Sequence, residues 1–287
     1  MPSSAYFYAE AFAVPVLPVA QLPYAAGHIP VGPPVSDHHD AAGIPMQLVD
    51  GKLVYKPAGL AQLGLAYVEA YRRTADPMHL AWATTIALKL DSLAVAVGSG
   101  RYLPYRMTFS IHADPRNLMR DPWFSGMAQG LELSLLVRLA EVTGDTTYLT
   151  LAGPYWASIR HLRATSGPWV SWVSGHYLWI EEYPQTDPEH TLNGFMFATF
   201  GVYDYWRVTQ SPEVLHYLRG ALTTLRVYAP KYRNPGGPAD YCLKHGKPQP
   251  KYHGVVTWQL REMALISGDS SFARLADLFA KDYVYHP

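Results

Sequence analysis

The sequence has few of the features that would assign it to a class at once. Cys242 is the single cysteine among 287 residues, so no intrachain disulfide can form, and one thiol supplies no ligand set for a structural zinc ion. That count fits a reducing compartment such as the cytoplasm, although a secreted protein could share it. The 23 basic and 23 acidic side chains cancel, which leaves no overall field to attract nucleic acid or a membrane surface. Any anionic partner must therefore be bound by a local patch.

The sequence also shows no recognisable targeting segment or cofactor-binding motif. The apolar stretch at residues 11–20 contains Pro15 and Pro18 and follows no basic segment, so we expect no signal peptide. No uncharged apolar run is long enough for a membrane span. Without a glycine-rich phosphate loop, a nucleophile elbow or an HExxH motif, we expect neither a cofactor nor a metal ion. The metal-like Asp-His-His-Asp run at residues 37–40 is of a kind that usually lies on the surface or packs against neighbours.

What the chain does contain is enough apolar sequence for a sizeable core, with 49% hydrophobic and 13% aromatic residues. Residues 1–50 are rich in proline and glycine, which forbids long helices, and we expect an irregular or short-stranded arm there. Over residues 51–287 one pattern recurs, in which an apolar helix is followed by a tight polar turn and a second amphipathic helix. The sequence therefore predicts an arm and one helical domain.

Four polar turns mark the recurring unit and predict four helical hairpins. The turns begin at Thr74, Thr143, Thr209 and Ser267. Each turn carries a side chain suited to capping the helix that follows, and the four caps are Asp76, Asp145, Ser211 and Asp269.

Each first helix also carries a lone amide in an apolar neighbourhood near its start. The four amides are Gln62, Gln129, Asn193 and Gln259. Helices that are apolar on most faces are inner helices, and a ring of them sheathed by outer helices forms an α/α toroid with long loops at one end. We therefore predict a mainly α fold, an incomplete toroid of about four hairpins. The amides then either line a polar cleft or satisfy buried backbone groups.

Two long connections between the predicted hairpins combine cations with aromatic rings. Residues 99–124 include Arg101 and Arg106, and residues 231–253 include Lys244 and His245 among tyrosines. Flat rings interleaved with cations suit an acidic sugar. The alternatives are a loop packed by its own aromatic residues and a solvated basic loop.

The segment at residues 181–184 (Glu-Glu-Tyr-Pro) is the strongest candidate for chemistry. It interrupts an apolar aromatic stretch and is expected to pack between Trp179 and Phe195. Such an environment would raise a carboxyl pKa and hold a phenol nearby, which suits groups that take and return protons.

Five motifs carry a family resemblance. They are residues 179–184 (WIEEYP), 192–197 (LNGFMF), 201–204 (GVYD), 241–245 (YCLKH) and 252–253 (YH). With residues 123–130 (WFSGMAQG) upstream, the chain resembles the C-terminal catalytic domain of heparosan D-glucuronyl C5-epimerases over about residues 100–287. The resemblance implies an α/α toroid that acts on glucuronate in a polysaccharide, so that an anionic uronate-containing glycan is the expected partner.

Roles follow from the resemblance by position. Glu182 and Tyr252 would flank C5 of the sugar, with Tyr183 and Tyr241 as supporting phenols. Asn193 would orient the substrate. Lys244 and Cys242 stand where the animal enzymes have arginine and aspartate.

The chemistry requires further groups around the sugar. A proton α to a carboxylate is a very weak acid, so cations or hydrogen-bond donors must stabilise the enediolate that forms. Lys244, His245 and Asn193 are candidates for that role. The remaining substrate-binding candidates are Gln129, Arg101 and Arg106.

The residues leave several outcomes open. An epimerase would convert D-glucuronate to L-iduronate by abstracting the C5 proton and reprotonating the opposite face, whereas a lyase would share the first step and expel the 4-O substituent. A noncatalytic uronate-binding module is a third reading. A glycosidase is less favoured, because Glu181 and Glu182 are adjacent and unsuited to straddling one bond. Exposed tyrosines and an apolar arm suggest a homodimer.

Overall fold

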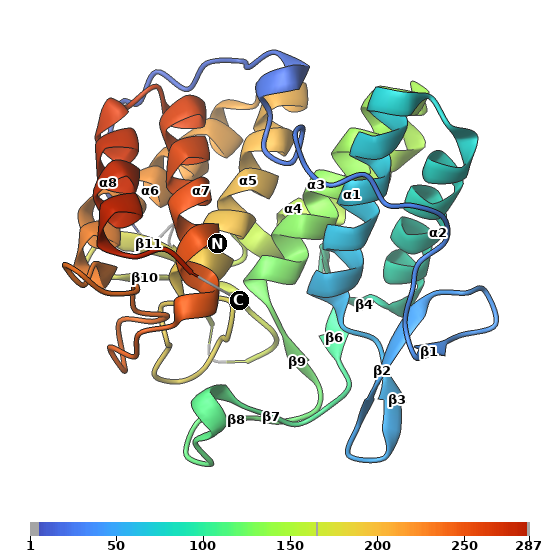
Figure 1. The fold of residues 1–287 in the computed structure, drawn as a ribbon, viewed down its shortest axis with the longest axis horizontal. Coiled ribbons are helices and arrows are strands. Elements are labelled where there is room, and N and C mark those ends of the chain that lie inside the picture. The colour runs from blue at the N-terminus through green and yellow to red at the C-terminus, as the bar shows by residue number, and fades with distance from the viewer. Residues whose placement is uncertain (1–5, 165, 286–287) are drawn as a thin grey trace.

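The computed structural model describes residues 6–164 and 166–285, and eight α-helices in these residues form four antiparallel hairpins (Figure 1). The hairpins are α1 (Pro57–Thr74) with α2 (Pro77–Leu93), α3 (Gly126–Thr143) with α4 (Thr147–Arg160), α5 (Leu192–Thr209) with α6 (Pro212–Tyr228), and α7 (Pro250–Ser267) with α8 (Ser270–Asp282). Each turn lies where the sequence predicts it. No helix within the described ranges combines the length and apolar character that crossing a bilayer requires.

Side-chain caps explain why three of the second helices begin where they do. Asp76 accepts a hydrogen bond from the backbone N–H of Met78 at 2.9 Å, and Asp145 and Asp269 make the equivalent bonds at the starts of α4 and α8. Ser211 occupies the predicted position before α6, but its side chain makes no capping hydrogen bond.

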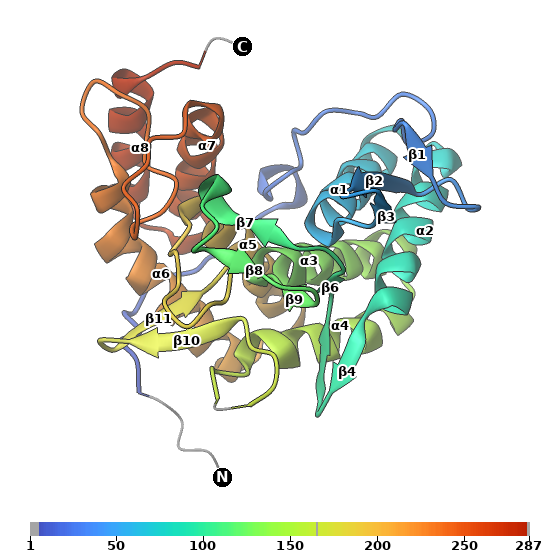
Figure 2. The ribbon, with the colours of Figure 1, turned by 90° about the horizontal axis from the view of Figure 1, so that it is seen from below.

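The first helix of each hairpin lies inside and the second lies outside. The inner helices pack in the order α1, α3, α5, α7, and the ring stays open between α7 and α1, as the view along the helices shows (Figure 2). Helices α3 and α5 cross closely because glycines face each other: a Cβ atom on Gly201 would lie 2.1 Å from the carbonyl oxygen of Gly130. The prediction of a mainly α, incomplete α/α toroid is confirmed.

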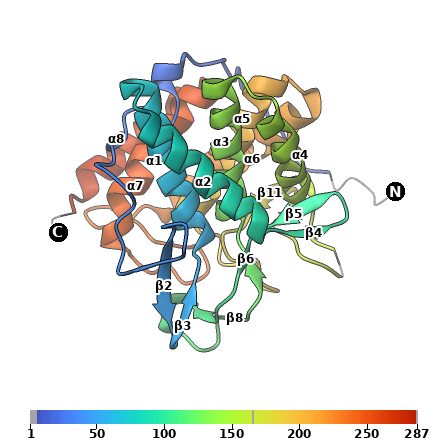
Figure 3. The ribbon, with the colours of Figure 1, turned by 90° about the vertical axis from the view of Figure 1, so that its right-hand side faces the viewer.

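Short antiparallel strands fill the connections. They are β1 (His38–His39), β2 (Pro45–Val49), β3 (Lys52–Val54), β4 (Val95–Val97), β5 (Gly100–Tyr102), β6 (Pro104–Tyr105), β7 (Phe109–Ser110), β8 (Leu118–Met119), β9 (Trp123–Phe124), β10 (Ser171–Ser174) and β11 (Tyr177–Ile180). Hairpin β7–β8 carries the 3-10 turn η2 (Ile111–Ala113) at its tip and projects beyond one end of the helices, below hairpins α1–α2 and α3–α4 in the side view (Figure 3).

The N-terminal arm covers the opposite end of the ring. It is irregular apart from η1 (Val19–Gln21) and the short strands, as expected. The backbone N–H of Leu17 donates to the hydroxyl of Tyr203 at 3.0 Å, and Arg138 donates to the carbonyl of Pro23, both near the C-terminal ends of inner helices. The predicted boundary at residue 50 falls in the turn between β2 and β3, so the division into two domains stays a prediction.

Each long connection runs from the end of an outer helix to the start of the next inner helix, so these loops gather at the end of the toroid where the inner helices begin. We call this the open end of the toroid.

Candidate functional site

Glu182 lies at the open end, between strand β11 and the first turn of α5. Its side chain is 8% exposed, and burial raises its pKa to about 7, against the opposing effect of hydrogen bonds from neighbouring hydroxyls. The hydroxyl of Tyr241 donates to the carboxylate at 3.3 Å from Oε2. A carboxyl group with a pKa near neutrality is suited to taking a proton and returning it.

Three phenols surround this carboxyl group. The hydroxyl oxygens of Tyr183 and Tyr241 lie 3.1 Å apart, and the ring of Tyr252 lies 5.2 Å from that of Tyr241. Burial raises the pKa of all three phenols, and the charge of Glu182 raises that of Tyr252 further. The structure therefore brings together the four residues that the resemblance places at C5, with the phenols in their protonated, donating form at neutral pH. We call Glu182, Tyr183, Tyr241 and Tyr252 the proton-transfer cluster, after the role that the family resemblance leads us to expect for them.

Asn193 faces the same place. Asn193, Tyr241 and Tyr252 line one narrow crevice that has no room for a water molecule. The Asn193 side chain is 2% exposed, and its Oδ1 atom has no hydrogen-bond partner among the described residues. Its backbone carbonyl accepts a hydrogen bond from Gln259 at 3.0 Å, which fixes the first turn of α5. An unpartnered acceptor beside two phenols is suited to a sugar hydroxyl.

Two helices begin in this region, and their N-terminal ends contribute a positive electrostatic potential. Helices α5 and α7 begin at Leu192 and Pro250, next to Asn193 and Tyr252 respectively. Free backbone N–H groups and the positive end of the helix dipole favour negative charge near such ends. Both starts therefore suit a uronate carboxylate better than a cation.

A larger groove adjoins the cluster. Its volume is about 790 Å³, and its lining combines cations with aromatic rings: Arg116, Arg120, Arg163, Lys244, Trp123, Phe124 and Trp169. The ring of Trp123 lies 5.7 Å from that of Tyr183, so the groove reaches the edge of the proton-transfer cluster. Cations beside flat rings suit the carboxylates and the apolar faces of a uronate chain.

Lys244 and His245 lie between the groove and the cluster. The Lys244 ammonium donates to the backbone carbonyl of Asp187 at 2.9 Å and lies 3.5 Å from Oε1 of Glu189. His245 contacts the other oxygen of Glu189, with 2.6 Å between Nδ1 and Oε2. Both predicted cations are thus held by Glu189, a residue that the sequence did not single out.

Gln129, Arg101 and Arg106 lie away from the proton-transfer cluster. Gln129 is fully buried, and its amide binds the backbone of Leu103 and Arg101 and the hydroxyl of Ser158. Arg101 pairs with Asp91. Gln129 therefore holds the start of the loop in place, and its amide satisfies buried groups, which is the second of the two alternatives that the sequence left open.

Arg106 is 59% exposed and lies 3.8 Å from Asp121 on a separate surface near β3. The structure does not bring it to the groove. Glu181, in contrast, is buried beside the site, where it accepts hydrogen bonds from Trp172 and from the backbone of His190. Its carboxylate is occupied in holding these groups.

Two residues near the site received no role from the sequence, although His112 belongs to the cation-rich and aromatic connection at residues 99–124. His112, at the tip of hairpin β7–β8, packs edge-on against Tyr241 with 5.6 Å between ring centroids. Glu189 is fully buried and contacts His245 and Cys242. No local pattern marks either residue, because their partners come from other loops.

Comparison with known proteins places this geometry in a family. Residues 99–281 match the model of the D-glucuronyl C5-epimerase C-terminus. A D-glucuronyl C5-epimerase of Caenorhabditis elegans is 26% identical over 185 residues, which are 56% of this chain and 29% of that protein. An uncharacterised protein of Methanocaldococcus jannaschii is 26% identical over 113 residues, 38% of this chain and 36% of that protein. The chain thus spans about a third of the length of these curated relatives.

Solved structures resemble the fold at low identity. An α-mannanase of family GH76 from Bacteroides thetaiotaomicron has a TM-score of 0.55 at 14% identity, covering 80% of this chain and 57% of that one. Cellobiose 2-epimerase from Spirochaeta thermophila has a TM-score of 0.54 at 15% identity, covering 79% of this chain and 59% of that one. These likenesses concern the toroid alone. The family match covers most of the chain, including all four residues of the proton-transfer cluster, and the chain belongs to the family of the D-glucuronyl C5-epimerase C-terminus.

Proposed function

We propose that this protein is a carbohydrate epimerase that inverts C5 of D-glucuronate residues in a heparosan-like glycan. The observation that carries the proposal is the buried carboxyl group of Glu182, with a pKa raised to about 7, in hydrogen-bond contact with Tyr241 and close to Tyr252. Family membership supports the same chemistry.

In the proposed reaction, the Glu182 carboxylate removes the C5 proton, and the electron pair moves into the sugar carboxylate to form an enediolate. Tyr252 then donates its phenolic proton to C5 from the opposite face, which leaves L-iduronate. A carboxyl pKa near 7 balances the fraction of Glu182 that is ionised against its strength as a base. Tyr241 and Tyr183 form a hydrogen-bonded chain that fixes the carboxylate and can relay a proton.

Recognition would fall to the groove and the helix starts. The Asn193 amide and the N-terminus of α5 would contact the reacting sugar, and Lys244 and the groove cations would bind neighbouring uronates. The crevice between Asn193 and Tyr252 is too narrow for a water molecule, so a sugar ring would enter it only if these side chains moved apart.

The test is incubation with heparosan-type oligosaccharide in deuterated water, followed by NMR of C5. Deuterium at C5 with mixed glucuronate and iduronate supports the proposal. Unsaturated uronate would indicate a lyase, new reducing ends without unsaturation a hydrolase, and binding without reaction a noncatalytic module.

Matched substitutions assign the roles. Glu182→Gln and Tyr252→Phe should each lower C5 exchange by at least about 100-fold. Tyr205→Phe is the control, because Tyr205 lies on the outer side of α5 against Trp156 and should leave exchange unchanged. Wild-type exchange in both site variants would remove these residues from the mechanism.

A further inference from the structure

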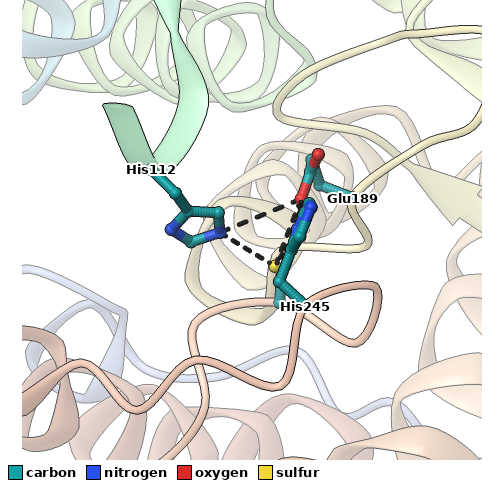
Figure 4. A group of neighbouring side chains, drawn as sticks. His112, Glu189 and His245 are labelled. Carbon is teal, nitrogen blue, oxygen red and sulfur yellow. Dashed lines mark hydrogen bonds and ion pairs between the residues drawn. The ribbon is translucent and has the colours of Figure 1, made fainter. Parts of the chain in front are cut away.

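Four side chains with metal-binding atoms converge beside the proton-transfer cluster. His112, Glu189, Cys242 and His245 each offer one donor atom, and these four atoms all lie within 4.8 Å of one another. Figure 4 shows His112 reaching from its hairpin toward Glu189 and His245, which face it from two other loops. The set is well shielded: Cys242 and the Glu189 side chain are fully buried, and the His112 side chain is 9% exposed.

The separations between donor atoms are close to those found around one small ion. Sγ of Cys242 lies 3.1 Å from Nε2 of His112, 3.2 Å from Oε2 of Glu189 and 3.5 Å from Nδ1 of His245. Oε2 of Glu189 lies 2.6 Å from His245 and 3.9 Å from His112. A tetrahedral zinc site with bonds of about 2.0–2.3 Å has donor atoms about 3.3–3.8 Å apart. Four of the five separations lie outside that range, by up to about 0.7 Å, so the side chains must shift by several tenths of an ångström to reach that arrangement.

We propose that His112, Glu189, Cys242 and His245 form a structural zinc site that joins three loops at the open end. The ligand types favour zinc over calcium or magnesium, which prefer oxygen atoms alone. Four protein ligands leave no open position, which is the pattern of structural rather than catalytic sites. A thiolate and a carboxylate together neutralise the two charges of Zn²⁺, once binding has displaced the thiol proton.

Neighbouring side chains contact two of the four proposed ligands. Nε2 of His245 lies 2.9 Å from the side-chain nitrogen of Asn117, so binding of an ion through Nδ1 requires the Asn117 amide to turn and present its oxygen to the Nε2–H group. The second oxygen of Glu189 lies 3.5 Å from the Lys244 ammonium, which holds the carboxylate in place. His112 has a φ of 58°, an uncommon conformation for a residue other than glycine and one that occurs at ligand sites.

The proposal differs from the expectation of no metal ion, which was based on the single cysteine and on the absence of motifs with closely spaced ligands. It also goes beyond the proposed epimerase chemistry, because a structural site would serve a glycan-binding module equally well. A bound ion would link hairpin β7–β8, through His112, to the loop that carries Tyr241, and would therefore restrict the movement of one relative to the other.

Metal binding can be measured without any activity assay. The full chain is stripped with a chelator, reloaded with Zn²⁺ and analysed by mass spectrometry of the metal content, with the expectation of about one Zn²⁺ per chain. Loading with Co²⁺ should give the intense near-ultraviolet absorption of a thiolate–cobalt bond and the visible bands of a tetrahedral ion. Zinc should also raise the melting temperature of the stripped protein.

Variants identify the ligands. Cys242→Ser should abolish the thiolate–cobalt absorption, and Glu189→Gln should lower zinc affinity by about 10–100-fold while retaining that absorption. His38→Ala is the control, because His38 belongs to the other histidine cluster and should leave loading unchanged. The proposal is overturned if the wild-type chain binds no stoichiometric Zn²⁺ and gives no thiolate–cobalt absorption. It is equally overturned if Cys242→Ser, folded by circular dichroism, binds zinc as tightly as wild type.

Discussion

A Cβ atom on Gly194 would lie 2.4 Å from Oε2 of Glu182 and 2.6 Å from its Cβ atom. The first turn of α5 therefore carries glycine at the one position where any side chain would collide with the candidate base. We expect Gly194→Ala to displace the carboxyl group and to lower C5 exchange by about tenfold or more, since small misplacements of a reacting group are costly. Rates of deuterium incorporation measure the effect.

The control for this change is Gly254→Ala on α7, where an added Cβ meets no atom within 4 Å. It should leave exchange intact and stabilise the fold by about 0.4–1 kcal/mol, because alanine has less freedom than glycine in the unfolded chain. Equal exchange rates in both alanine variants would contradict the proposed position of Glu182.

Glu182 should also make stability depend on pH. Its folded pKa of about 7 exceeds the ordinary value of 4.5, so the folded state binds more protons than the unfolded state between these values. Its contribution to stability is therefore fully present below about pH 4.5 and is lost as the pH rises through 7. We expect Glu182→Gln to equal wild type near pH 4.5 and to become more stable by about 2–3 kcal/mol at pH 8. Urea unfolding at both pH values tests this, and a constant difference would contradict the raised pKa.

Lys244 lines the groove beside Asp187 without touching the proton-transfer cluster. We expect Lys244→Ala to raise the KM for a uronate oligosaccharide about 3–10-fold and to leave kcat within about twofold, because the lost contact would act equally on bound substrate and transition state. Lys52→Ala, on the exposed strand β3, is the matched control. An unchanged KM would remove Lys244 from the substrate site.

A buried ion network at the other end of the ring should dominate stability. Arg138 is fully buried and lies 2.7 Å from Glu69 and 2.9 Å from Asp204. Arg138→Met would leave the buried carboxylate of Asp204 without its paired cation and Glu69 with only Arg72, 3.6 Å away, and we expect a loss of about 3–5 kcal/mol in the free energy of unfolding. Arg160→Met breaks only the exposed pair with Glu213 and should cost about 1 kcal/mol or less. Comparable losses in the two variants would contradict this reading of the network.

Much of the fold could be predicted from the sequence because helical hairpins leave local marks. The caps Asp76, Asp145 and Asp269 act on backbone groups two residues away, so their positions alone indicate where the second helices begin. The motifs around Glu182 and Tyr252 likewise marked the residues that the structure gathers into one cluster. The role of Gln129 could not be read in this way, because its partners Arg101 and Ser158 lie 28 and 29 residues away.

The sequence by itself determined the four hairpins, the toroid and the residue types available for proton transfer, because periodicity, capping and turn chemistry act over a few residues. Only the tertiary structure decided which loops meet at the open end. The side chains of His112 and Cys242 are in contact although 130 residues separate them, and Glu189 contacts Cys242 from 53 residues earlier in the chain. Contacts of that kind depend on the direction in which the packed helices place their connecting loops, and no local pattern in the sequence specifies that direction.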